Sequence, residues 1–222
     1  MKKLFLFFLL FTAVDGFSQD RTGLKLWYNK PAGDTWENAL PIGNGMLGAM
    51  VYGNVDTENI QLNENTLWSG SPNRNDNPLA LDSLAEIRRL IFAGKQKEAE
   101  TLANRVIISK KSQGQMFEPL GNLLLSFDGH QNYSNYYREL DIQNAIQKTT
   151  YKVGDIVFTR EVIASFPDRL IVMHLTASKP HSLSFTASFS TPEPKATIKT
   201  NSSNGLTIAG TTIDHEGVAG MV

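Results

Sequence analysis

The sequence of 222 residues contains no cysteine. Without cysteine the chain has no disulfide framework and no thiolate ligands for a zinc or iron–sulfur site. It also has no cysteine to which a lipid anchor could be attached after a signal sequence. The fold must therefore be stabilised by an ordinary packed core, for which a hydrophobic content of 41% is typical.

The sequence also has no excess of positive or of negative charge. Lys and Arg together number 21 and Asp and Glu 22, which gives a formal net charge of −1. Nucleic acids and anionic membranes are bound through positive charge, so the sequence gives no reason to expect either as a partner. A neutral partner such as a carbohydrate is compatible with this balance.

Motifs for metal or phosphate binding are missing as well. There is no Gly-Lys-Ser/Thr phosphate loop and no Gly-x-Ser-x-Gly nucleophile turn. The histidines lack the i, i+4 spacing that is typical of a zinc site on a helix. They are His130, His174, His181 and His215. We therefore expect no metal site and no cofactor.

Residues 1–18 have the three parts of a secretory signal peptide. A basic start at Lys2 and Lys3 precedes an apolar run over residues 4–14, and small residues lead to a cleavage site after Ser18. The apolar run is too short for a membrane span of about 20 residues. We expect the mature protein to be periplasmic or secreted, with no membrane contact after cleavage.

The mature chain, residues 19–222, is dominated by short strand patterns separated by turn signals. Strands are expected at 24–28, 47–52, 61–63, 123–127, 151–153, 156–159, 170–175, 183–189, 196–200 and 206–208. Gly43-Asn44-Gly45 indicates a tight turn, and Gly154-Asp155 indicates a hairpin. The pattern predicts a mainly β protein, a large antiparallel β-sandwich of supersandwich-like type, in one domain.

Two helices are expected as a small insertion after a loop over residues 71–78. In the first helix, Ser83 with Glu86 three positions later predicts an N-terminal capping box, and Gly94 predicts the C-terminal end. The apolar faces of the two helices comprise Leu84, Ile87, Leu90, Ile91, Ala99, Leu102, Ala103 and Val106. Their spacing is that of amphipathic helices.

The last residues, 218–222, have the pattern of the beginning of a further strand, with no turn or polar tail after them. A sandwich that closes its sheets would not be expected to end in this way. We therefore expect the chain to be a C-terminally incomplete piece of a longer protein.

The best candidate for a sugar contact is the polar and aromatic stretch after the strand expected at 61–63. It offers Asn63, Glu64, Asn65, Thr66 and Trp68. Amides and carboxylates hydrogen-bond sugar hydroxyls, while an indole ring stacks on the apolar face of a sugar. The alternative is that Glu64 and the two asparagines hold a loop in shape and Trp68 fills the core.

Six blocks of the sequence, in order, resemble the amino-terminal domain of family-95 glycoside hydrolases. They are ALPIGNGMLGAMVYG, IQLNENTLWSGSP, IRRLIFAGKQKEAETLA, FEPLGNLLLSF, YYRELDIQNAI and FTREVIASFPDRLIVMHL. The blocks extend over nearly the whole mature chain. Two positions depart from the family pattern: Met46, where a basic residue is common, and Asn122, where an acidic residue is common.

The resemblance implies an exo-acting α-L-fucosidase that hydrolyses terminal α-L-fucosyl linkages with inversion, although some family members act on α-L-galactosides. Glycosidic cleavage needs two carboxyl groups across the sugar. In this family they belong to a separate (α/α)6 toroid, and nothing in this chain resembles that toroid. No catalytic residue is therefore expected in the chain. The implied partners are a fucosylated oligosaccharide or glycan and the missing C-terminal catalytic domain, toward which the loop from Asn63 to Trp68 would reach.

Two other functions stay open on the sequence alone. One is a stand-alone, non-catalytic carbohydrate-binding β-sandwich, which should close its own sheets. The other is a disaccharide phosphorylase, whose sandwich domain is distantly similar. The LNENTLWSG and PLGN blocks favour the fucosidase.

Overall fold

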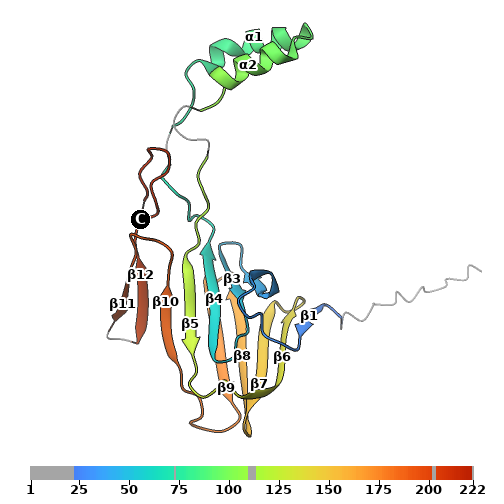
Figure 1. Cartoon of the computed structure of the whole chain (residues 1–222), viewed down its shortest axis with the longest axis vertical. Coiled ribbons are helices and arrows are strands. Elements are labelled where there is room, and N and C mark those ends of the chain that lie inside the picture. Colours follow the sequence, from blue (N-terminus) through green and yellow to red (C-terminus); the bar gives the residue numbers. More distant parts are fainter. Residues whose placement is uncertain (1–22, 73, 110–113, 202–203, 222) are drawn as a thin grey trace, which may run out of the picture.

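The computed structural model describes residues 23–72, 74–109, 114–201 and 204–221. The expected signal peptide, residues 1–18, lies outside the described residues. In the described residues, two five-stranded sheets and one two-stranded sheet are antiparallel throughout, and two α-helices lie apart from them (Figure 1). The predicted mainly β, antiparallel sandwich with a two-helix insertion is confirmed.

The first sheet has the strand order β1-β6-β7-β8-β9 and the second sheet has the order β10-β5-β4-β3-β2. The strands of the first sheet are β1 (Lys25–Tyr28), β6 (Tyr133–Asp141), β7 (Ile146–Val153), β8 (Ile156–Ser165) and β9 (Leu170–Ala177). Those of the second sheet are β10 (Thr186–Ser190), β5 (Gly121–Ser126), β4 (Thr57–Glu64), β3 (Leu47–Val51) and β2 (Leu40–Gly43). A separate pair is formed by β11 (Thr197–Asn201) and β12 (Gly205–Ala209).

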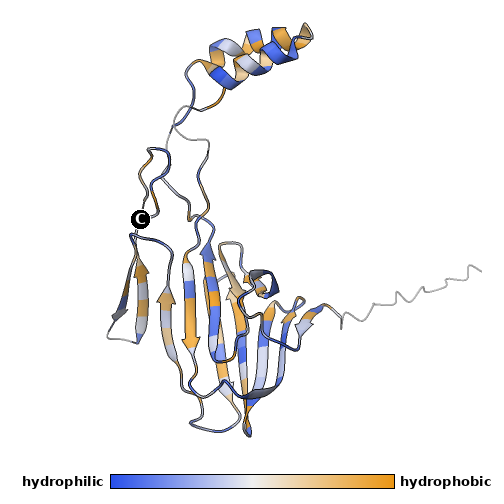
Figure 2. Cartoon of the chain, in the orientation of Figure 1, coloured by the Kyte–Doolittle hydropathy of each residue, from blue (hydrophilic) through white to orange (hydrophobic). Residues whose placement is uncertain are grey.

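The apolar core lies between the two five-stranded sheets. Val51 and Ile60 from the second sheet are buried together with Val162 from β8. Successive side chains of a strand point to opposite faces, so a strand packed on one side alternates apolar and polar residues. Figure 2 shows this alternation along the strands. Each of these buried side chains stabilises the fold by about 1.5–3 kcal/mol.

An ion pair is also buried between the sheets. The guanidinium of Arg160 on β8 lies 3.1 Å from the carboxylate of Glu58 on β4, and both side chains are almost inaccessible to solvent. Arg160 also donates to the carbonyl of Val55 and to the hydroxyl of Tyr151, and lies over the ring of Phe127. Because one strand of each sheet contributes a partner, this network fixes the sheets relative to each other.

The helices are α1 (Ala80–Phe92) and α2 (Gln96–Val106). The predicted capping box at Ser83 is wrong, since α1 begins three residues earlier and Ser83 donates an intrahelical bond to Leu79. Asn77 provides the start instead: its carbonyl accepts from the amide of Ala80, and its side-chain oxygen accepts from the amide of Leu79. An Asn before the first turn satisfies backbone donors as a capping serine would.

The predicted end of α1 at Gly94 is confirmed. Gly94 has φ of +72°, its amide donates to Ile91, and the amide of Lys95 donates to Leu90. These two bonds are the pattern of a helix that ends through a left-handed glycine. The chain therefore reverses at once, and α2 packs antiparallel against α1.

The two helices form a hairpin, residues 80–106, that buries mainly its own side chains. The cluster contains Ile87, Leu90, Ala99 and Val106, as the periodicity predicts. Ile91 was expected on the same face but is 54% exposed. In Figure 1 the hairpin stands away from the sheets. Neither helix of the described chain has the length and apolarity needed to span a membrane.

Several boundaries differ from expectation. Strands β2 and β6 were not expected, and β4 is longer than the predicted segment. The expected strand at 218–222 is wrong for residues 218–221. There the chain turns back through Glu216 and Gly217, both at positive φ, so that Val218 pairs with His215 in an isolated bridge. Residue 222 lies outside the described residues.

Candidate functional site

Three segments that are distant in the sequence meet at one end of the second sheet. They are the turn at residues 44–46 between β2 and β3, the loop at residues 64–68 after β4, and residues 115–118 before β5. We call them the sheet-end cluster. Strand order explains the meeting, because β2, β3, β4 and β5 are consecutive neighbours in the sheet.

The turn at 44–46 is held by Asn44, which is buried. Its side-chain oxygen accepts from the amides of Met46 and Leu47, at 3.1 and 2.8 Å. Its side-chain nitrogen donates to the carbonyl of Ser165 at the end of β8, at 2.7 Å. Gly45 has φ of +88°, as the predicted tight turn requires. One side chain thus fixes the turn and connects it to the other sheet.

The loop at 64–68 is held mainly by its own polar groups. Glu64 accepts from the amide of Thr66 at 2.9 Å and also from the Thr66 hydroxyl. The side-chain oxygen of Asn63 accepts from the amide of Glu64. Asn65 donates from its backbone amide to Met46 and from its side chain to the carbonyl of Gly45. The loop therefore rests directly on the turn at 44–46.

Trp68 is attached at two points but is not a core residue. Its indole nitrogen donates to the carbonyl of Asn65 at 3.0 Å. Its ring lies 5.1 Å from the ring of Phe117 between centroids, and the two residues form an isolated bridge. The Trp68 side chain is nevertheless 42% exposed and that of Phe117 is 47% exposed. An aromatic pair therefore stands at the surface of the sheet end.

All five residues predicted to contact sugar lie together in this loop or at the end of β4. The contacts of Asn63, Glu64 and Asn65 agree with the alternative in which these residues hold the loop in shape. The same alternative expected Trp68 to fill the core, whereas Trp68 is exposed. Direct contact between these residues and sugar stays a prediction.

Phe117 and the acidic pair Glu118 and Glu193 were not predicted from the sequence. The amide of Glu118 donates to the carbonyl of Leu67, which positions Phe117 against Trp68. Both carboxylate oxygens of Glu118 are buried, beside the carboxyl group of Glu193. Burial and the neighbouring Glu118 carboxylate raise the pKa of Glu193. The FEPLGN block contains these residues, but no local pattern reveals that Glu118 faces a glutamate 75 positions away.

The two positions that depart from the family pattern lie in different places. Met46 is 40% exposed in the turn of the sheet-end cluster. Asn122 lies on β5, where its side chain donates to the hydroxyl of Ser190 on the neighbouring strand β10. Asn122 therefore acts within the sheet, and Met46 contributes an apolar surface to the sheet end.

Groups of three or more His, Asp or Glu side chains with metal-binding geometry do not occur among the described residues. The carboxylates near the sheet end are engaged in different ways: Glu64 shapes the loop, and Glu118 is buried beside Glu193. The sheet-end cluster can therefore offer hydrogen bonds, an exposed aromatic pair and a rigid loop to a ligand or to another domain.

A protein-family model described as "Glycosyl hydrolase family 65, N-terminal domain" matches residues 26–221. Alpha-L-fucosidase 2 of Arabidopsis thaliana is 41% identical over 169 residues, which are 75% of this chain and 20% of that protein. Probable alpha-fucosidase A of Aspergillus oryzae is 32% identical over 171 residues, 73% of this chain and 23% of that protein. The same-named protein of Aspergillus niger is 28% identical over 162 residues. The chain spans about a fifth of the length of these relatives.

Proposed function

Because the chain belongs to the glycosyl hydrolase family 65 N-terminal domain family and has α-fucosidases as relatives, we propose that it is the N-terminal domain of an exported, exo-acting α-L-fucosidase. The predicted fucosidase-type relationship is confirmed at the level of the family. The proposed reaction is hydrolysis of terminal α-L-fucosyl linkages with inversion of the anomeric configuration. The two carboxyl groups for this reaction would be supplied by a C-terminal catalytic domain.

The observation that supports this function most is the sheet-end cluster. The blocks GNGML, NENTLW and FEPLG carry the resemblance to fucosidases, and the fold brings them to one end of one sheet. They form a partly aromatic surface, with Trp68 and Phe117 exposed side by side. Such a surface is suited to forming one wall of a sugar pocket that another domain completes.

The experiment uses the full-length protein that contains this chain. Incubation with a glycan carrying a terminal α-L-fucosyl group should release L-fucose. Proton NMR during the first turnovers should show the β-anomer first, because inversion converts an α-linkage into a β-product. Initial release of the α-anomer would contradict the inverting mechanism. Binding of the glycan without any release of fucose would instead favour the carbohydrate-binding sandwich.

Export is proposed from residues 1–18 alone. The basic start and the apolar run over residues 4–14 are typical of a signal peptide. N-terminal sequencing of the protein from the producing cell should begin at Gln19 if the proposed cleavage is correct. A protein that retains Met1 in the cytoplasm would contradict it.

The role proposed for the loop is to shape the sugar pocket or to buttress it. Replacing Trp68 with Ala in the full-length protein should lower kcat/KM for a fucosylated glycan by about two- to tenfold, since one exposed aromatic contact contributes about 0.5–1.5 kcal/mol beyond its buried area. Glu64→Ala should also lower thermal stability, because it removes the acceptor for Thr66. Unchanged activity and stability in both variants would contradict the role.

A further inference from the structure

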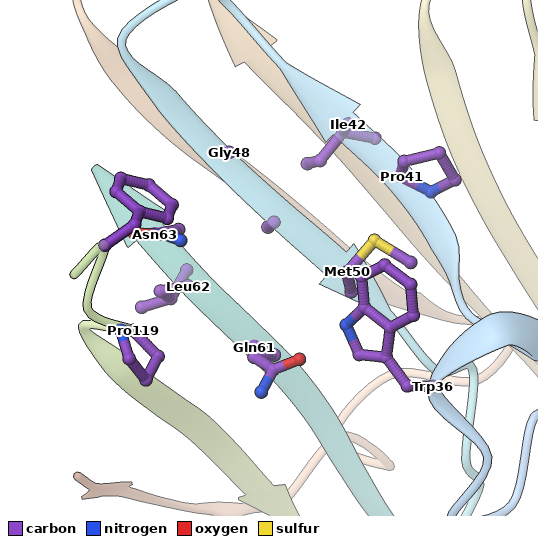
Figure 3. A pocket seen from close by; sticks show the side chains of 11 residues that line it. Trp36, Pro41, Ile42, Gly48, Met50, Gln61, Leu62, Asn63 and Pro119 are labelled. Atoms are coloured by element: carbon purple, nitrogen blue, oxygen red, sulfur yellow. The ribbon is translucent and has the colours of Figure 1, made fainter. Parts of the chain in front are cut away.

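An open hollow of about 390 Å³ lies on the outer face of the second sheet, beside the sheet-end cluster. Trp36 stands at one side of it and Pro119 at the other, with Gln61 between them (Figure 3). Met50 and Phe117 also line the hollow. We call this hollow the outer groove. Its volume falls at the lower end of the range for small-molecule sites, about 300–1,000 Å³.

Strand register explains how the outer groove is built. Pro41 on β2 pairs with Met50 on β3, and Met50 pairs with Gln61 on β4, so these three side chains form one row on one face. The residues between them, such as Ala49 and Ile60, point into the core. In the next row on the same face, Gly48 pairs with Asn63. Gly48 has no side chain, and this leaves room above the sheet.

The walls of the outer groove are aromatic and exposed. Trp36 belongs to a 3-10 helix (Trp36–Asn38) that precedes β2, and its side chain is 53% exposed. Phe117, which also lines the outer groove, contacts Trp68 of the predicted sugar-contact loop. Flat aromatic rings offer apolar contact area at little cost in side-chain entropy. Two such rings lining one hollow suit a ligand with apolar C–H faces.

The floor of the outer groove offers hydrogen bonds but no charge. No Asp, Glu, Lys, Arg or His lines it among the residues that the structure describes. Within the same part of the chain, no partner hydrogen-bonds the side-chain amide of Gln61, and Asn63 uses only its oxygen, toward Glu64. An amide provides both a donor and an acceptor, which matches the hydroxyls of a sugar. An anionic or cationic ligand would find no counter-charge.

We propose that the outer groove binds the neutral oligosaccharide to which the fucosyl group is attached, on the leaving side of the bond to be cleaved. This inference rests on the proposed function, because it extends the sugar site from the loop at 64–68 to Trp36. Asn63, which precedes this loop on β4, and Phe117, which contacts Trp68 of the loop, both line the outer groove, so the loop and the groove form one continuous surface. The protein should therefore select fucosylated oligosaccharides over small fucosides.

The test compares Trp36→Ala with the parent protein, both at full length. A fucosylated oligosaccharide and an aryl α-L-fucoside, which lacks the oligosaccharide, serve as the two substrates. The ratio of kcat/KM for the oligosaccharide to that for the aryl fucoside should fall about two- to tenfold in Trp36→Ala, as expected for one lost stacking contact. Gln61→Ala should lower the same ratio by a smaller factor.

Trp27→Ala is the matched control. Trp27 is 61% exposed, lies on β1 of the first sheet and stacks on Tyr137, outside the outer groove. Its replacement should leave the substrate ratio unchanged. An equal fall of the ratio in Trp27→Ala and Trp36→Ala would overturn the proposal. So would a ratio that stays constant in Trp36→Ala and Gln61→Ala.

Two further outcomes separate this proposal from the proposed function. If the parent protein cleaves neither substrate, the proposed function fails, and binding is measured by saturation-transfer NMR with the oligosaccharide. Loss of that binding in Trp36→Ala then supports the outer groove, and retained binding overturns it. If Trp36→Ala instead lowers the melting temperature and leaves oligosaccharide binding intact, another part of the protein covers the groove, and the proposal is wrong.

Discussion

The sandwich and the helical hairpin bring their buried residues together from very different distances along the chain. Arg160 and Glu58, at the centre of the sandwich, are 102 positions apart. The buried cluster of the hairpin comes entirely from residues 87–106. Local contacts form at a low entropic cost, whereas pairing of distant strands requires the closure of long loops.

The two regions also differ in the polarity of the side chains that they bury. The sandwich buries the Arg160–Glu58 ion pair beside an apolar core. The hairpin buries apolar side chains and keeps its ion pairs at the surface, as in Glu86–Arg89 and Lys95–Glu98. The hairpin should therefore tolerate loss of a charge far better than the sandwich does.

The largest effect is expected from Arg160→Met. It leaves the carboxylate of Glu58 buried without its partner, and removal of one member of a buried pair costs about 3–5 kcal/mol. Urea unfolding should show this loss. Lys148→Met is the matched control, since it breaks an exposed pair with Glu161 between neighbouring strands, which contributes about 0–1 kcal/mol. Equal losses in the two variants would contradict the importance of burial.

A smaller and more local effect is expected from Leu90→Ala. The cavity left in the hairpin cluster should cost about 2–3 kcal/mol. Hydrogen exchange should become faster in α1 and α2 while amides of β7 and β8 keep their protection. Phe92→Ala is the control, because Phe92 is 88% exposed and its loss should cost less than about 0.5 kcal/mol. Loss of protection in both regions would mean that the hairpin is not an independent unit.

The smallest effect is expected from Glu118→Gln, and it depends on pH. Burial and the Glu118 carboxylate raise the pKa of Glu193. The folded protein therefore favours the protonated form of Glu193, and this contribution is lost as pH rises from the ordinary carboxyl range through the raised pKa. Glu118→Gln removes the repulsion, so the variant should lose less stability over that window than the parent does.

Asp214→Asn is a control with the opposite sign. Hydrogen bonds from the amide of Gly220 and from Lys195 hold the pKa of Asp214 below its usual range. The contribution of Asp214 is thus present above the ordinary carboxyl range and lost as pH falls. Thermal melts between acidic and neutral pH should separate the two variants. A parallel pH dependence in both would contradict the assigned causes.

Local sequence patterns predicted the elements whose cause is local. Gly94 ends α1, Gly154 lies in the hairpin between β7 and β8, and Gly45 forms the turn after β2, because each position requires a positive φ. The spacing of Ile87 and Leu90 predicted the packed face of α1. The pattern was wrong where two local signals competed: Ser83 was predicted as the cap, but α1 begins at Ala80, after a turn held by the Asn77 side chain.

Features that depend on distant residues could not be predicted in the same way. Nothing around Arg160 indicates that it is buried, because its partners lie at Val55 and Glu58. The five predicted sugar-contact residues were found as a group since they are adjacent in sequence. Phe117 and Trp36 were missed because only strand order and register bring them to the same face.

The Asn44-Gly45 dipeptide has a consequence for the chemical ageing of the protein. Asn-Gly sequences deamidate through a cyclic imide, which forms when the glycine amide attacks the asparagine side chain. In the folded protein, the side-chain oxygen of Asn44 is bonded to Met46 and Leu47 and its side-chain nitrogen to Ser165. These bonds hold the side-chain amide away from the position that the attack requires. Unfolding would release it, and a resulting carboxylate would repel the carbonyl of Ser165. Deamidation at Asn44, measured by peptide mapping after storage, should therefore record how often this end of the sandwich has opened.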